Sequence, residues 1–164
     1  ELTVFGVKLS DLSFLRGKAL TKLGINGCEV QDLSPVIGMP LQSLTAGGCK
    51  NLEDLTPLRN LPLERLELAL TAISDLAPLE GAPLRFLNLR GCRNVKDVKL
   101  LASFLTLEEV VLPPEASPEP LRALPKLKRL SYRSTLGKDS QNIPAQTVAE
   151  FWAEYDAQQA AGKK

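Results

Sequence analysis

The sequence contains no histidine, only three cysteines and few aromatic residues. The missing histidine excludes Ser-His-Asp and Cys-His nucleophilic sites and every zinc site that uses histidine. Three cysteines in 164 residues fall far below the density of a disulfide-stabilised scaffold, and an odd number cannot pair completely within one chain. We therefore expect reduced thiols and no histidine-based catalysis.

Neither sign of charge dominates, since 20 lysine and arginine residues face 19 aspartate and glutamate residues. Without a basic excess, nucleic acid is not an expected partner. No apolar run reaches the roughly 18 to 20 residues of a membrane span, and the N-terminus lacks the basic and then apolar layout of a signal peptide. We expect a soluble monomer. We also expect a piece of a longer chain, because the sequence opens without methionine and in the middle of a repeat.

What the sequence does contain is a repeat of 20 to 23 residues. Its first signature is Leu-x-x-Leu-x-Leu-x-x-Cys, with copies that begin at residues 20, 41, 63, 84, 107 and 127 after a half copy at residues 2–9. Alternate residues of a strand point to opposite faces, so each copy predicts a short strand with its leucines inward. Such strands stack into a parallel sheet, and we predict a solenoid over residues 1–134.

The second half of each repeat opens with an aspartate, and the five positions are Asp11, Asp32, Asp54, Asp75 and Asp97. Only about a dozen residues remain for the return path of each repeat, which predicts short 3-10 turns on the convex side. Ser34 and Thr56 directly precede proline and are predicted to be the N-caps of such turns. A row of aspartates could bind a metal ion, but acceptance of backbone N–H bonds in the turns is the favoured interpretation.

These repeats resemble the leucine-rich repeats of bacterial internalins over residues 1 to about 134. The departure is at the ninth position, where that family usually carries asparagine and this chain carries Cys28, Cys49, Thr71 and Cys92. Cysteines in adjacent repeats could form a disulfide, but buried free thiols are favoured. The predicted fold is therefore an α/β leucine-rich-repeat solenoid with a parallel sheet on its concave face.

The leucine repeat does not continue to the end of the chain. Residues 135–146 are rich in glycine, serine, asparagine and proline, and we predict a polar connector. A helix over residues 147–160 follows, and its apolar stripe consists of Val148, Phe151, Trp152 and Tyr155. Because the last repeat of a solenoid needs a cap, we expect the stripe to pack there. The alternative is that it docks a partner or another copy of this chain.

The sequence of residues 144–158 resembles the C-terminal tails of leucine-rich-repeat and kinase-linked proteins from planctomycete-type bacteria. This resemblance implies an alternative role, as the C-terminal regulatory segment of a serine/threonine protein kinase whose catalytic domain lies outside this chain. Within the sequence itself, the glycine-rich loop, strand lysine and catalytic aspartates of a kinase are missing. We predict no catalytic residue, no cofactor and no metal here.

The concave face is the surface on which a solenoid presents side chains to a partner. From the third full repeat onward, arginines stand beside an aromatic ring there, which is the composition of binding hot spots. We predict a non-catalytic protein-binding scaffold with the contact residues Arg65, Glu67, Phe86, Asn88, Arg90, Glu109 and Arg129. The alternative is that these are ordinary solvated strand residues. Leu70, exposed by register, is a further candidate.

Overall fold

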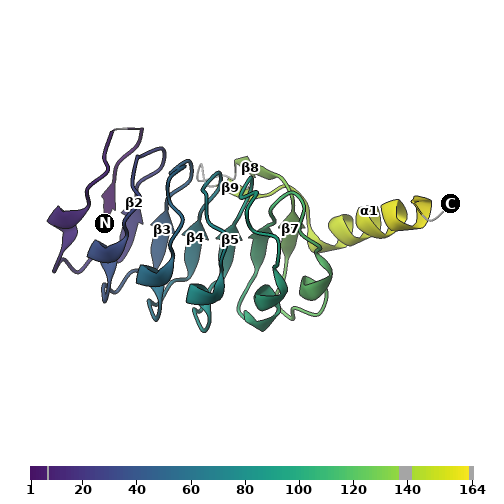
Figure 1. Cartoon of the computed structure of the whole chain (residues 1–164). Helices are drawn as coiled ribbons and strands as arrows, with labels where there is room; N and C mark the ends of the chain where they lie inside the picture. The colour runs from purple at the N-terminus through teal and green to yellow at the C-terminus, as the bar shows by residue number, and fades with distance from the viewer. Residues whose placement is uncertain (7, 137–141, 163–164) are drawn as a thin grey trace.

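The computed structural model describes residues 1–6, 8–136 and 142–162. One parallel sheet holds seven short strands in chain order: β1 (Leu2–Thr3), β2 (Lys22–Gly24), β3 (Ser43–Thr45), β4 (Arg65–Glu67), β5 (Phe86–Asn88), β6 (Glu109–Val111) and β7 (Arg129–Ser131). Each repeat contributes one strand and then returns on the opposite side, so the chain winds as a stack of coils that runs from left to right in Figure 1. The predicted leucine-rich-repeat solenoid is confirmed.

The strands form where the leucine signature predicts them, two residues after each repeat begins. The middle residue of each strand points into the core, and Leu44, Leu66 and Leu87 are fully buried there. These leucines are paired in register from strand to strand. Burial of a leucine side chain stabilises a fold by about 1.5 to 3 kcal/mol. The leucine columns are therefore the main apolar contribution of the repeat.

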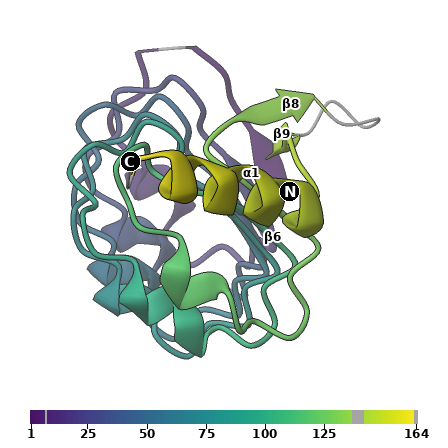
Figure 2. The same cartoon turned by 90° about the vertical axis from the view of Figure 1, so that its right-hand side faces the viewer.

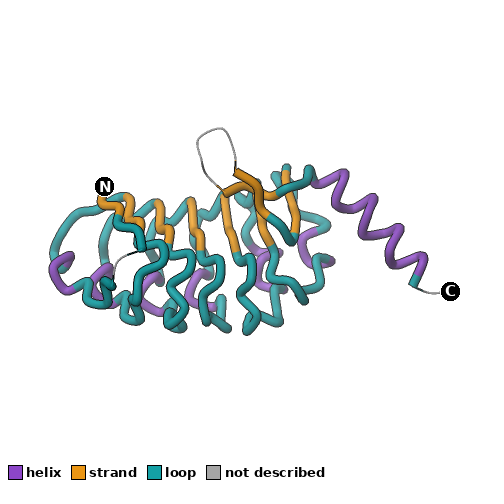
Figure 3. The backbone as a smooth tube through the Cα atoms, turned by 90° about the horizontal axis from the view of Figure 1, so that it is seen from above, coloured by secondary structure: helices purple, strands orange, loops and turns teal. Residues whose placement is uncertain are grey.

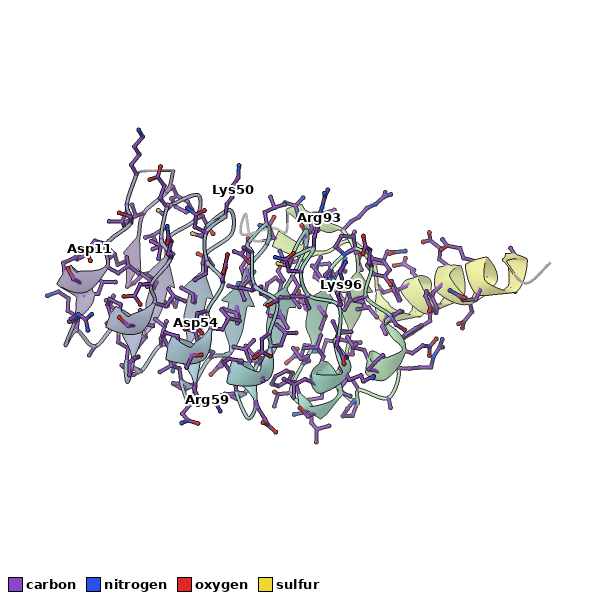
Figure 4. All side chains as sticks on the ribbon, in the orientation of Figure 1. Asp11, Lys50, Asp54, Arg59, Arg93 and Lys96 are labelled. Carbon is purple, nitrogen blue, oxygen red and sulfur yellow. The ribbon has the colours of Figure 1, made fainter. Side chains whose placement is uncertain are left out.

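The convex side consists of short 3-10 turns, on the side opposite to the strands (Figure 3). They are η1 (Ser13–Leu15), η2 (Ser34–Val36), η3 (Thr56–Leu58), η4 (Ala77–Leu79), η5 (Lys99–Ser103) and η6 (Glu119–Leu121). At the start of the first five turns, an aspartate carboxylate accepts a hydrogen bond from the backbone N–H two residues later, at 2.7 or 2.8 Å. Figure 4 places two of these aspartates, Asp11 and Asp54, on this side. The turn-forming role of the aspartates is confirmed.

The predicted N-caps of these turns are wrong in detail. Neither η2 nor η3 has a capping side chain at its N-cap position, which is a leucine in both turns. The backbone N–H groups of Ser34 and Thr56 donate instead to Asp32 and Asp54. The aspartate therefore takes the capping role from two residues upstream, because its carboxylate reaches the first free N–H of the turn.

The ninth position of the repeat links neighbouring coils through thiols. The Sγ atoms of Cys49 and Cys92 donate to the carbonyl oxygens of Ile25 and Leu68 in the preceding repeat, each at 3.0 Å. Burial raises the pKa of both thiols. All three cysteines of the chain are buried and unpaired, which confirms the free-thiol interpretation.

After β7 the chain forms a β-hairpin that the sequence did not predict. Strands β8 (Ser134–Leu136) and β9 (Asn142–Pro144) pair antiparallel within the segment predicted as a connector. The chain then runs along the outer edge of β7, where Leu130 N donates to Gln146 O at 3.3 Å and Val148 N donates to Lys128 O at 2.9 Å. The exposed edge of the sheet is thus covered at this end, which protects it from pairing with other chains.

The predicted C-terminal helix is present as α1 (Val148–Ala161), and Thr147 and Glu150 form its capping box. Phe151 is the buried member of the apolar stripe, and its ring lies 5.6 Å from that of Tyr132 in the last repeat. The guanidinium of Arg122 lies over the Trp152 ring at 3.9 Å. From Asp156 onward the described side chains are exposed, and the helix extends beyond the last repeat (Figures 1 and 3). Only its first half therefore packs on the solenoid.

Candidate functional site

The strand register arranges the outward side chains of the concave face in two rows. The first row consists of Lys22, Ser43, Arg65, Phe86, Glu109 and Arg129. The second row consists of Gly24, Thr45, Glu67, Asn88, Val111 and Ser131. Six of the seven predicted contact residues belong to these rows between β4 and β7. Arg90 lies two residues beyond β5, at the exit turn, and is exposed.

The hairpin β8–β9 lies on this face and contacts both rows (Figure 2). The Arg129 guanidinium donates to the Pro144 carbonyl oxygen through Nε at 2.9 Å and through one terminal nitrogen at 2.7 Å. Arg65 donates to the Asn142 carbonyl oxygen at 3.2 Å, and the Asn142 amide donates to Glu67 Oε1 at 2.6 Å. The chain therefore places its own extended strand, β9, on the predicted contact surface.

Three of the predicted contact residues are almost fully buried. Phe86 is 4% exposed, Asn88 0% and Glu67 7%. The Arg65 guanidinium stacks on the Phe86 ring at 3.5 Å from its centroid. Partial burial lowers the pKa of Arg65, against the opposing effect of the Glu67 and Glu109 carboxylates. Sequence reasoning missed the contacts of β9 with Arg65, Glu67 and Arg129, since nothing in the polar segment after β7 predicts a strand.

Two buried polar atoms in this region have no hydrogen-bond partner among the described residues. They are Nδ2 of Asn88 and Oε2 of Glu109, on the adjacent strands β5 and β6. A buried polar group without a partner costs about 1 to 3 kcal/mol. The hairpin therefore satisfies the polar groups beneath it only in part.

The concave face remains open over β1 to β4, where it forms a groove of about 680 Å³. Its floor and walls consist largely of small or polar residues from β1–β3 and the turns after them, namely Thr3, Phe5, Lys22, Gly24, Asn26, Ser43 and Thr45. Arg65, Glu67 and Asn142 form its end nearest the hairpin. We call this space the open groove. It reaches only two of the predicted contact residues, Arg65 and Glu67.

A second, smaller hollow of about 210 Å³ lies beside Phe86 and Glu109 at the entry ends of β4 to β6. One of its carboxylates, that of Glu108, is paired: Arg85 lies 2.6 Å from Glu108 Oε1, and Lys128 also contacts Glu108. These two cations, the lysine first, hold the pKa of Glu108 below its ordinary value. The charge of Glu108 is thus balanced, whereas Oε2 of Glu109, which also lines the hollow, has no hydrogen-bond partner among the described residues.

Leu70 lies at the exit turn after β4 and is 51% exposed. Its φ of 60° is in the left-handed region, which is uncommon for a residue with a side chain. Because its side chain lies over Gly91, the predicted exposure is only half realised. It stands outside the open groove.

The described residues show no constellation for metal chemistry and no membrane-spanning helix. Within them, no group of three or more histidine, cysteine, aspartate or glutamate residues could hold a metal ion. Over the same residues, no helix has the length and apolar character needed to cross a bilayer.

No family model and no curated protein matches the sequence. Among solved structures, the chain is similar to an internalin (inlF) from Listeria monocytogenes, with 27% sequence identity, a TM-score of 0.68 and coverage of 80% of this chain and 40% of the internalin. It also matches an internalin C2 from the same species, with 20% identity, a TM-score of 0.44 and coverage of 78% of each chain. The chain thus spans about two fifths of the first of these proteins.

Proposed function

From the premise that this chain is a leucine-rich-repeat solenoid of the internalin type, we propose that it is a non-catalytic scaffold that binds another protein through its concave face. The observation that carries the proposal is the open groove over β1 to β4. It combines hydroxyl, amide, charged and aromatic groups in one concavity of about 680 Å³. A concave surface with a few convergent polar groups is the usual form of a recognition site.

The proposed contact surface lies closer to the N-terminus than the sequence alone suggested. Arg65 and Glu67 remain in it, at the end of the open groove. Phe86, Asn88, Glu109 and Arg129 belong to the part of the face near or beneath the hairpin, and they would contact a partner only at its border. Lys22, Ser43 and Thr45 take their place as the central contact residues of the proposal.

Affinity capture with three forms of the chain tests this proposal. The blocked form carries Ser43→Trp and Lys22→Glu, which fill the open groove and reverse its central charge. The matched control carries Arg59→Trp and Lys50→Glu, two exposed positions outside the groove (Figure 4). We expect a protein from the source-cell lysate to bind the native and control forms but not the blocked form. Equal capture by all three forms, or by none, would contradict use of the concave face.

The alternative role as a regulatory segment of a serine/threonine kinase rests on the resemblance of residues 144–158 alone. In the structure these residues cover the edge of β7 and form the start of α1. Both the pairing with β7 and the packing of α1 are explained as a cap on the last repeat. No described contact therefore favours the kinase role over the scaffold role.

A further inference from the structure

We propose that the open groove binds an extended peptide segment that lies along the solenoid axis, in line with β9. This inference rests on the proposed use of the concave face and names the kind of partner that fits it. The chain already places one of its own extended segments, β9, on the concave face. The contacts of β9 indicate which groups on this face bind a polypeptide.

The contacts of β9 use the backbone of alternate residues. The carbonyl oxygens of Asn142 and Pro144 accept from Arg65 and Arg129, both of which belong to the first row of the concave face. Because Asn142 contacts β4 and Pro144 contacts β7, β9 crosses the strands of the sheet and runs along the solenoid axis. Carbonyl oxygens are present in every peptide, so this mode of binding depends on an extended backbone more than on one particular sequence.

The register extends the same two rows into the open groove. Lys22 and Ser43 stand in the row of Arg65, and Thr45 stands in the row of Glu67. The ammonium group of Lys22 and the hydroxyl of Ser43 are donors for peptide carbonyl oxygens, as the arginines are for β9. The groove thus continues an interface that the chain already uses, with donors at equivalent positions.

The floor of the open groove over β1 to β3 consists of short side chains. Gly24 has no side chain, and the space that a Cβ would take is filled by the side chains of Thr3 and Thr45, whose atoms lie 2.9 to 3.2 Å from that position. Both threonines line the groove. Small residues at such positions permit the close approach of a ligand backbone.

The two ends of the open groove set the length of the bound segment. Asn142 closes one end, and Phe5, 65% exposed, lies beyond β1 at the other. Three strand spacings separate β1 from β4, or about 14 Å, which an extended peptide spans with about four residues. We therefore expect a short segment with an apolar side chain over Phe5. Because the groove is lined by Lys22 and Arg65 and also by the carboxylates of Glu1, Glu64 and Glu67, we expect no net negative charge on the segment.

Selection from a displayed library of random linear twelve-residue peptides tests the inference with the native chain. Synthetic versions of the enriched peptides are then titrated by fluorescence anisotropy against four proteins: native, Ser43→Trp, Lys22→Glu and the control Lys50→Glu. We expect Ser43→Trp to abolish binding and Lys22→Glu to weaken it by about tenfold or more, since a charge-assisted hydrogen bond contributes about 1.5 to 3 kcal/mol. Lys50→Glu should leave the affinity unchanged, and thermal unfolding checks that each variant is folded.

Two results would overturn the inference. Either no linear peptide is enriched, or the enriched peptides bind all four proteins equally. If the capture experiment meanwhile retains a folded partner that the blocked form loses, the scaffold function stands and only the extended-peptide mode is wrong. If the groove substitutions change neither the capture of a protein nor the affinity for peptides, both proposals are wrong.

Discussion

The aspartate before each of the first five convex turns makes the most regular polar contact among the described residues. The carboxylates of Asp11 and Asp32 accept hydrogen bonds from the serine two positions later. The bond from the serine backbone N–H is the larger cause and the bond from its hydroxyl the second, and together they hold the pKa of both aspartates below its ordinary value. The pKa of Asp54 is lowered in the same way, with the Thr56 hydroxyl as the larger cause. A lowered pKa means that the folded state favours the ionised carboxylate. The resulting stabilisation is complete above the unfolded pKa and is lost as pH falls through the lower folded pKa.

A triple variant, Asp11→Asn, Asp32→Asn and Asp54→Asn, tests this coupling. The asparagine oxygen still accepts the backbone hydrogen bond, but the side chain no longer titrates. Urea unfolding at steps from pH 6 to pH 3 should show a steep loss of stability in the parent below about pH 4 and a shallower loss in the variant. A triple Glu29→Gln, Glu53→Gln and Glu80→Gln variant at exposed sites controls for net charge. Parallel curves for parent and asparagine variant would contradict the assignment.

Leu70 is a residue-scale departure from the repeat. The equivalent exit turns carry Gly27, Gly48 and Gly91, all with positive φ, whereas Leu70 adopts φ of 60° with a side chain. That side chain uses the space beside Gly91, where a Cβ atom would lie 2.5 Å from Leu70 Cδ2. The two positions are therefore coupled.

A double-mutant cycle measures this coupling. Gly91→Ala alone should lower the free energy of unfolding by about 2 kcal/mol, because it combines left-handed strain with a clash against Leu70. In a Leu70→Gly background the clash disappears, and the same substitution should cost only about 1 kcal/mol. Urea denaturation of the four proteins provides the energies. Additive effects would mean that the leucine side chain does not depend on Gly91.

At the scale of elements, the repeat was predictable because one pattern recurs in one register. The buried leucines, the convex turns and the thiols of Cys49 and Cys92 each follow from local spacing. The amphipathic helix was predictable for the same reason, since Thr147 and Glu150 form a capping box directly before the apolar stripe. These features depend on residues close in sequence or one repeat apart.

The hairpin was not predictable from the same information. Its contacts join Asn142 to Arg65 and Glu67, which lie 77 and 75 positions earlier. Residues 134–146 show no alternation of apolar and polar side chains that would indicate a strand. The predicted positions of six of the contact residues on the concave face match the register, but the hydrogen bonds of Arg65, Glu67 and Arg129 to this distant strand were not predictable. The position of a residue on the concave face therefore does not by itself determine whether a partner can reach it.

The hairpin can be removed without cutting the cap, because Ala145 N already donates to Arg133 O at 3.0 Å. We expect a variant in which Asn-Gly replaces residues 134–144 to keep the solenoid, since that pair forms two-residue hairpin turns. Loss of the hydrogen bonds that Arg65, Glu67 and Arg129 make with β9 should lower the free energy of unfolding by about 1 to 3 kcal/mol. Fluorescence of Trp152, the single tryptophan, should stay unchanged because α1 keeps its contacts. An unchanged urea curve would show that the hairpin contributes nothing to the fold.

At the scale of the whole molecule, the two ends of the solenoid are protected differently. At the C-terminal end, the chain pairs with the outer edge of β7 and Phe151 covers the last core layer. At the other end, Leu2, Val4 and Leu9 are only partly buried, and no described strand pairs with the outer edge of β1. Because each repeat of a solenoid contacts only its neighbours, local stability should be lowest at the less protected end.

Hydrogen exchange followed by mass spectrometry tests this order of opening. We expect amides of β1 and β2 to exchange faster than those of β6 and β7 in the parent chain. Phe151→Ala removes a buried ring, a change that costs about 3 to 5 kcal/mol in a core, and should speed exchange in β7 and η6. Exchange in β1 to β3 should stay the same, because the effect of a lost cap weakens with each repeat. Phe14→Ala, at a ring that is 51% exposed on the convex side, serves as the control. Uniformly faster exchange after Phe151→Ala would mean that the solenoid opens as one cooperative unit, and that the cap stabilises every repeat at once.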